Sequence, residues 1–240
     1  MIARRALTGL AILALLAGCR ASEPRHSARV DPRNYDSFFL WGGVRAPGYL
    51  DRARTVYILA GEIRRGDPLR LVLLQPAPPR ARQPELWLTV RAERLDWGEG
   101  VYGEIDRLLA QWAGAGNRVA GLQVDFDAAT RGLEDYRTFL TKLRSRLPKR
   151  YGLSVTGLMD WSANGDPAVL AGLVGVVDEV VVQTYQGTRT IPGYARYFRR
   201  IARLPVPHRV ALVEGGEWSE PPELANDPQF RGYVVFLIKH

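Results

Sequence analysis

Residues 119–128, with the sequence VAGLQVDFDA, constrain the fold more than any other segment. In a β-strand, successive side chains point to opposite faces, so this segment separates into two sets. The first set is wholly apolar and comprises Ala120, Leu122, Val124 and Phe126. The second set carries Gln123, Asp125 and Asp127. A strand with one apolar and one polar face is typical of a parallel barrel covered by helices, whose functional residues lie at the carboxyl ends of the strands.

The rest of the chain repeats this rhythm and predicts an α/β fold, a lean (β/α)8 barrel of the TIM type, with short or missing helices around the first and last strands. Eight strands are expected, at residues 37–41, 55–62, 85–94, 119–128, 153–161, 177–185, 209–214 and 233–239. Helices are expected at residues 101–115, 133–147, 166–173 and from 192 to about 203. Residues 69–75 are compatible with a hairpin insertion or with a short helix.

An open, doubly wound sheet is the rival architecture. Polar or aromatic residues occur near the predicted carboxyl ends of seven strands: Trp41, Glu62, Arg91, Asp127, Asp160, Tyr185 and Glu214. In an open sheet such residues gather at one switch point, so their spread around the sheet favours the barrel. Asp125, Asp127, Asp160, Tyr185 and Glu214 are therefore expected at one mouth.

The first nineteen residues have the pattern of an export signal. Arg4 and Arg5 precede an apolar run that is too short to span a bilayer, and the segment ends in Leu-Ala-Gly-Cys19. This ending resembles the bacterial lipobox, in which the cysteine is lipidated. The expected organisation is a signal peptide at 1–18, a tether at 19–36 and a single barrel domain at 37–240. Arg20 in place of Asp favours the periplasmic face of the outer membrane.

Composition argues against several classes of function. The formal charge is +8, but the arginines form no run, which is more typical of a solvated surface than of a nucleic-acid groove. Cys19 is the single cysteine, so it can form neither an intramolecular disulfide nor a cysteine zinc site. The three histidines, His26, His208 and His240, fit no metal-ligand spacing. No metal, cofactor or nucleic acid is expected, and the oligomeric state is left open.

Two motifs resemble a known family. GLQVDFD at 121–127 resembles the fourth-strand signature of glycoside hydrolase family 18 chitinases, Asp-Gly-x-Asp-x-Asp-x-Glu, and Gln183-Thr184-Tyr185 resembles their sixth-strand motif. Most of residues 36–240 is also similar to an uncharacterised family of exported bacterial barrels. The segments that carry this second similarity are Trp41, 59–62, 123–127 and 156–161.

The resemblance implies roles for three residues. Asp127 would be the general acid, Asp125 would orient the substrate's acetamido group, and Tyr185 would donate a hydrogen bond to the acetamido oxygen. The chain departs from the family pattern at four positions: Ala120, Gln123, Asp127 and Gln186. Three of these replace a family carboxylate by an uncharged residue, and Asp127 is one methylene shorter than the family's catalytic Glu.

The two carboxylates predict an altered titration. Alternate positions on a strand are about 7 Å apart, so two partly desolvated carboxylates there should not both ionise at their ordinary pKa. The outer one, Asp127, is expected to keep its proton and to donate it to a ligand.

Further substrate-binding candidates, chosen for their places near strand ends, are Gln123, Trp41, Glu62, Asp160, Trp161, Gln183 and Glu214. The expected ligand is a cell-envelope or environmental glycan. Two alternatives stay open: a glycan-binding barrel without catalysis, and a divalent-metal site in which Asp160 or Glu214 joins the Asp-x-Asp pair.

Overall fold

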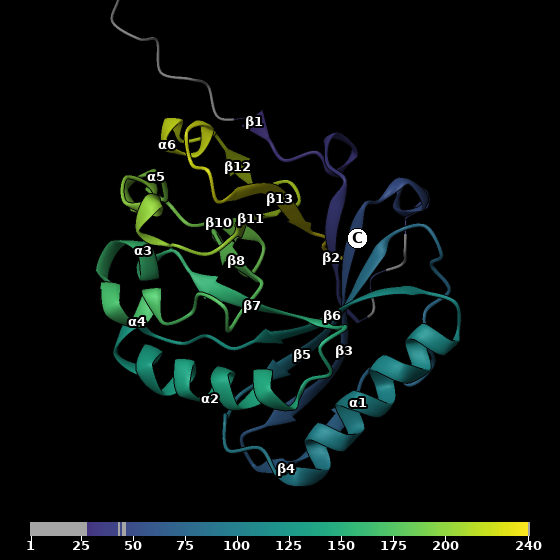
Figure 1. The fold of residues 1–240 in the computed structure, drawn as a ribbon. Helices are drawn as coiled ribbons and strands as arrows, with labels where there is room; N and C mark the ends of the chain where they lie inside the picture. The colour runs from purple at the N-terminus through teal and green to yellow at the C-terminus, as the bar shows by residue number, and fades with distance from the viewer. Residues whose placement is uncertain (1–27, 43, 45–46, 240) are drawn as a thin grey trace, which may run out of the picture.

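The computed structural model of the protein describes residues 28–42, 44 and 47–239, and these form a closed barrel of eight parallel strands (Figure 1). The strands in barrel order are β2 (Ser37–Leu40), β3 (Thr55–Arg64), β5 (Glu85–Ala92), β6 (Arg118–Asp125), β7 (Gly152–Leu158), β8 (Glu179–Gln183), β11 (His208–Val213) and β13 (Phe230–Phe236). The first strand, β2, pairs in parallel with β3 on one side and with β13 on the other. This double pairing closes the sheet, so the predicted barrel is confirmed over the open sheet.

Residues 69–75 belong to a hairpin insertion, and the helix alternative is wrong. β4 (Asp67–Leu73) pairs antiparallel with the end of β3, and no helix lies between β3 and β5. Cα and the side chain of Leu69 approach Gly98, just before the first long helix. The hairpin therefore covers part of the barrel where a (β/α)8 barrel has a helix.

Two long helices cover the outer face of the central strands (Figure 1). α1 (Glu99–Gly114) and α2 (Leu133–Arg146) bury the apolar residues that recur at helical spacing. The remaining helices are short: α3 (Asp160–Asn164), α4 (Pro167–Ala171), α5 (Ala195–Phe198) and α6 (Pro222–Ala225), with 3-10 turns η1 (Pro32–Asn34), η2 (Gly48–Arg52), η3 (Thr130–Gly132) and η4 (Ile201–Arg203). The single helix predicted from 192 to 203 is thus broken into α5 and η4. Among the described residues, no helix is long and apolar enough to cross a membrane.

The segment before the barrel packs against it. β1 (Ala28–Arg29) pairs antiparallel with β12 (Glu217–Trp218), and the Val30 side chain is buried. Residues 28–36, predicted as the end of a tether, are therefore part of the folded unit. The predicted signal peptide and Cys19 lie outside the described residues.

A close approach of two strands explains the glycine in the segment 119–128. A Cβ atom on Gly121 would lie 2.0 Å from the carbonyl oxygen of Gly152 on β7. On Gly152, a Cβ atom would lie 2.7 Å from the indole ring of Trp87. The Trp87 ring stacks on Tyr57, with ring centres 6.0 Å apart, and fills this part of the barrel interior. The half of the barrel near the amino ends of the strands is thus a packed core. The mouth formed by the carboxyl ends of the strands is left for a ligand.

Candidate active site

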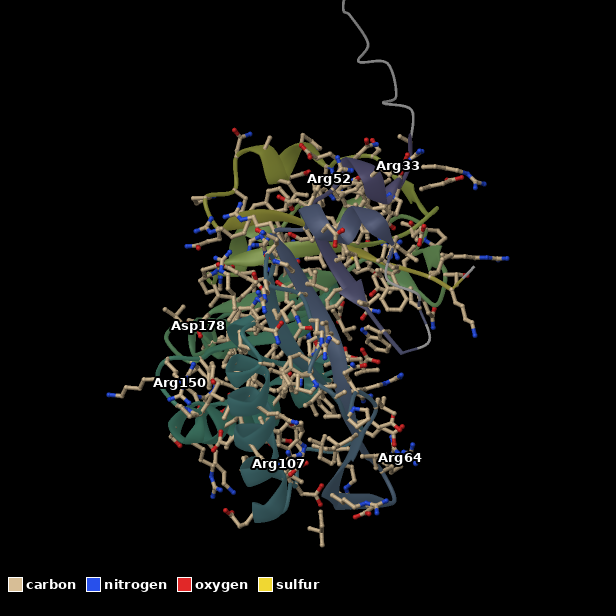
Figure 2. All side chains as sticks on the ribbon, turned by 90° about the vertical axis from the view of Figure 1, so that its right-hand side faces the viewer. Arg33, Arg52, Arg64, Arg107, Arg150 and Asp178 are labelled. Atoms are coloured by element: carbon tan, nitrogen blue, oxygen red, sulfur yellow. The ribbon has the colours of Figure 1, made fainter. Side chains whose placement is uncertain are left out.

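A cavity of about 310 Å³ opens among the carboxyl ends of the barrel strands. Its lining comprises Phe39, Trp41, Arg91, Asp125, Asp127, Thr156, Val181, Gln183, Tyr185, Gly187, Thr188, Ala211 and Phe236. In Figure 2, β3 runs from near Arg52, at the top, to Arg64, its last residue, at the lower right. The cavity therefore occupies the end of the barrel that such folds use for binding and catalysis.

Asp125 ends β6 and is partly buried in the cavity wall. Its Oδ1 accepts a hydrogen bond of 2.8 Å from Oγ1 of Thr156 on β7. Burial raises the pKa of Asp125 from 3.8 to about 6; the negative charge of Asp127 adds to this rise, whereas the Thr156 hydroxyl and the Arg91 charge oppose it. This carboxyl therefore keeps its proton to a higher pH than an ordinary aspartic acid does.

Asp127 lies two residues beyond the end of β6 and is exposed to solvent within the cavity lining. The strand predicted to reach residue 128 thus ends three residues earlier. The expectation that Asp127 sits on the inner face of a regular strand is corrected. The raised pKa found in the pair belongs to Asp125, the inner group, because that side chain is the more deeply buried.

Tyr185, Gln183 and Trp41, which were predicted to contact a ligand, also line the cavity. Tyr185 begins β9 (Tyr185–Gln186), and its ring stacks on Phe236 with centres 5.2 Å apart. Burial raises the pKa of its hydroxyl well above the ordinary value, and Asp125 and Asp127 raise it further. Trp41 meets the other side of Phe236 edge-on, at 5.3 Å. The tyrosine hydroxyl therefore stays protonated and available as a hydrogen-bond donor.

Arg91 and Thr156 belong to the cavity but were not among the predicted ligand-binding residues. Both lie on inner faces of their strands: Arg91 pairs in register with Asp125, and Thr156 bonds to it. The position of Arg91 could have been predicted from the alternation Trp87-x-Thr89-x-Arg91. In a strand, this spacing places the arginine on the same face as the two interior residues.

A second cavity of about 590 Å³ adjoins the first, sharing Arg91, Asp127, Gln183, Tyr185 and Gly187 with it. It continues over Asp160 and Tyr197. Gly187, at φ +59°, makes the tight turn from β9 to β10 (Arg189–Thr190) above both cavities. Together, the two cavities offer room for more than one sugar ring, and Asp160 lies in the second.

Gln123 lies below the cavity and is fully buried. It accepts a 3.2 Å hydrogen bond from Thr89 and donates one of 3.1 Å to Ser154. Its amide is thus engaged in the barrel interior, so the predicted contact with substrate is replaced by a role in supporting the cavity floor.

Three other predicted binding residues lie away from the cavities. Trp161 is 1% exposed, packs on Tyr136, and its indole N–H donates to the carbonyl of Ala128. Glu62 pairs with Arg64, and Glu214 accepts from the backbone N–H of Ile238. Residues 160 and 161 belong to α3, so the strand predicted to reach 161 ends at Leu158. Trp161 is a core residue, and the two glutamates belong to the rim of the barrel.

The divalent-metal alternative lacks a third ligand. Within residues 28–42, 44 and 47–239, no group of three His, Cys, Asp or Glu side chains is arranged to hold a metal ion. Glu214 is directed to Ile238, and Asp160 accepts a hydrogen bond from Asn164. Neither completes a site with Asp125 and Asp127.

Asp125→Asn is expected to stabilise the protein at neutral pH. Because folding raises this pKa, the unfolded chain releases the proton near the ordinary value of 3.8 and the folded state near 6, so stability falls as pH rises through this window. The full shift corresponds to about 3 kcal/mol, and contact with solvent reduces the expected gain to about 1–2 kcal/mol. An Asn side chain avoids the penalty and can still accept from Thr156.

Urea unfolding at about pH 4 and about pH 7.5 measures this gain. The variant and the wild type should differ at the higher pH and converge at the lower one. Asp127→Asn is the control, since its exposed position should give a smaller change. Equal stability of Asp125→Asn and the wild type at both pH values would contradict the assignment.

The region that carries these residues also has a family match. Residues 89–204 match DUF3142, a domain family of unknown function. The matched segment includes Arg91, Asp125, Asp127 and Tyr185. The chain has no significant sequence match among the curated proteins.

Solved structures with a similar fold include two chitinase-like barrels. The spore cortex-lytic enzyme SleL of Bacillus cereus superposes with a TM-score of 0.52 at 18% identity, over 75% of this chain and 50% of SleL. The chitinase domain of the spore coat protein CotE of Clostridium difficile gives 0.50 at 11% identity, over 80% of this chain and 67% of that domain. The chain thus spans about half the length of SleL. The predicted likeness to chitinase-like barrels is confirmed for the fold.

Proposed function

We propose that the protein is a glycoside-hydrolase-like barrel that binds a glycan across the two adjoining cavities. Asp127 would act as the general acid that cleaves the glycosidic bond. The observation that supports this most is the unequal carboxyl pair at the end of β6. Asp125 is withdrawn from water and has a pKa of about 6, whereas Asp127 is open to the cavity. Glycoside hydrolysis needs a carboxyl group that supplies a proton to the leaving oxygen. In this pair the burial of Asp125 keeps a proton available up to about pH 6, and Asp127 is the member open to the ligand.

In this mechanism Asp127 donates its proton to the glycosidic oxygen as the bond from that oxygen to the anomeric carbon breaks. The substrate's own acetamido oxygen attacks the anomeric carbon, as in substrate-assisted glycosidases, and water later opens the cyclic intermediate. Asp125 orients the acetamido group from below. Tyr185, whose hydroxyl keeps its proton, donates to the acetamido oxygen.

A non-catalytic glycan-binding barrel is the second candidate. It is favoured by the position of Asp127 on a loop two residues after β6, where the side chain is exposed and one methylene shorter than Glu. Such a carboxyl is less firmly placed than one fixed on a strand. This candidate uses the same aromatic wall and the same ligand.

The test is a panel of chitin and cell-wall oligosaccharides, assayed by calorimetry for binding and by release of reducing ends for cleavage. Tyr185→Phe should weaken binding by about 10-fold, because it removes one hydrogen bond to the ligand. Tyr35→Phe is the matched control, since the Tyr35 ring packs against Tyr233 outside the cavity. Binding without cleavage would favour the second candidate, and the absence of binding to every oligosaccharide would contradict both.

We further propose that the chain is a lipoprotein held through Cys19 at the periplasmic face of the outer membrane. The support is the Leu16–Cys19 sequence behind a basic and apolar leader. Cys19→Ala should release the protein from the membrane fraction, and globomycin should block its processing. An unchanged membrane fraction in Cys19→Ala cells, with unchanged processing, would show that another device anchors the protein.

A further inference from the structure

Arg91, at the end of β5, places a guanidinium in both cavities. Its side chain is exposed and lines each of them. Its Cζ atom lies 5.6 Å from the centre of the Trp41 ring, which supports the guanidinium from one side. No carboxylate of the described residues lies within ion-pair distance of it, although ten other arginines of the chain have such a partner.

The two carboxylates nearest in register are engaged elsewhere. Arg91 pairs along the backbone with Glu62 of β3 and with Asp125 of β6. Glu62 accepts from Arg64 at 2.6 Å, and Asp125 accepts from the Thr156 hydroxyl at 2.8 Å. The guanidinium therefore keeps its hydrogen-bond donors for a group that enters the cavity.

We propose that Arg91 recognises a carboxylate on the bound sugar, so that the ligand is an acidic glycan. This inference rests on the proposed glycan-binding function of the same cavities. A guanidinium is planar and binds a carboxylate through two parallel hydrogen bonds, a geometry that a neutral hydroxyl cannot match. Trp41, beneath the guanidinium, offers an apolar face to the sugar ring.

The acidic side chains of the cavities fix the orientation of such a ligand. Asp127 lines both cavities, and Asp160 lines the second, which Trp41 does not line. Their charges repel the sugar carboxylate and so disfavour the reversed orientation of the ligand. Attraction to Arg91 favours the orientation in which the carboxylate contacts the guanidinium. A sugar carboxylate has two common sources: the ring carboxyl of a uronic acid, and an acid group attached through an ether to an amino sugar.

The experiment measures the affinity of the folded chain for three probes by calorimetry: a neutral chitin oligosaccharide, an oligouronate, and an oligosaccharide of amino sugars that carries an ether-linked acid. Each acidic probe is also used as its methyl ester, which keeps the shape and removes the charge. The proteins are the wild type, Arg91→Gln, Arg91→Lys and, as control, Arg107→Gln, whose guanidinium pairs with Glu104 on α1 and does not line the cavities.

For the wild type and for Arg107→Gln, at least one acid should bind about 10-fold or more tightly than its ester. The acid that does so identifies the source of the carboxylate. Arg91→Gln should lose this preference, and Arg91→Lys should keep part of it, since it retains the charge but not the paired hydrogen bonds. Equal binding of acid and ester to the wild type would overturn the inference, as would a preference that survives in Arg91→Gln. Binding of the neutral probe alone would be consistent with the proposed function and would contradict this inference. The absence of binding to every probe would contradict both.

Discussion

Asp127→Asn is expected to reduce glycosidase turnover by about 100-fold or more without loss of folding. Asn is close to Asp in shape but has no acidic proton, and a positioned general acid contributes roughly 10²–10⁴ in rate. The residue is exposed on the loop after β6, so its replacement removes no buried contact. Stability should be unchanged or slightly higher, because the substitution also relieves the repulsion between Asp127 and Asp125.

The control is Asp135→Asn, which changes an exposed carboxylate in the first turn of α2. Asp135 lines neither cavity and has no part in the proposed proton transfer. Turnover in this variant should stay within a few-fold of the wild type. Glycan affinity should be retained in Asp127→Asn, because an amide still forms hydrogen bonds. Full turnover in Asp127→Asn would remove this residue from the mechanism.

The pH profile distinguishes the two carboxyl roles. Since the pKa of Asp125 is about 6, wild-type turnover should fall as pH rises above that value, because the carboxyl pair then no longer holds the proton that the leaving oxygen needs. Asp125→Asn should turn over substrate at a low rate, and this rate should no longer decline near this pH. NMR titration of the carboxyl carbons measures the same pKa directly.

Alternation of side chains was enough to predict the barrel and the place of Asp125. Leu122 and Val124 are fully buried on the outer face of β6, while Gln123 is buried on the inner face. A side-chain period of two leaves only one way to satisfy both sets, so the strand and its inner residues follow from the sequence. The long helices α1 and α2 follow in the same way from their apolar spacing.

The residues at which strands end were predicted less accurately than the strands themselves. The wrong predictions about site residues follow from these misplaced strand ends. A strand stops where its neighbours stop offering hydrogen bonds, and that register belongs to the pairing of strands rather than to one segment. β7 ends at Leu158, so Trp161 turns into α3 and packs against Tyr136. In the same way, β11 ends at Val213, and Glu214 accepts from Ile238 at the rim.

Arg209→Ala should cost about 3–5 kcal/mol of unfolding free energy at neutral pH. Glu179, at the start of β8, is 8% exposed in the barrel interior and accepts hydrogen bonds from three side chains. Arg209 Nε donates to Oε2 at 2.7 Å, while the hydroxyls of Tyr57 and Ser154 donate to Oε1 at 2.6 and 3.1 Å. Removal of the arginine leaves a buried carboxylate without its cation, and a charge in that position is strongly destabilising.

Arg107→Ala is the control: Arg107 pairs with Glu104 on the exposed face of α1, and such pairs contribute at most about 1 kcal/mol. The double variant Arg209→Ala, Glu179→Gln should recover part of the loss, since the amide is neutral and still accepts from Tyr57 and Ser154. Urea unfolding of the four proteins at neutral pH gives these differences. A loss in Arg209→Ala no greater than in Arg107→Ala would mean that water reaches Glu179, and that the half of the barrel near the amino ends of the strands is not the closed support on which the Asp125–Asp127 pair depends.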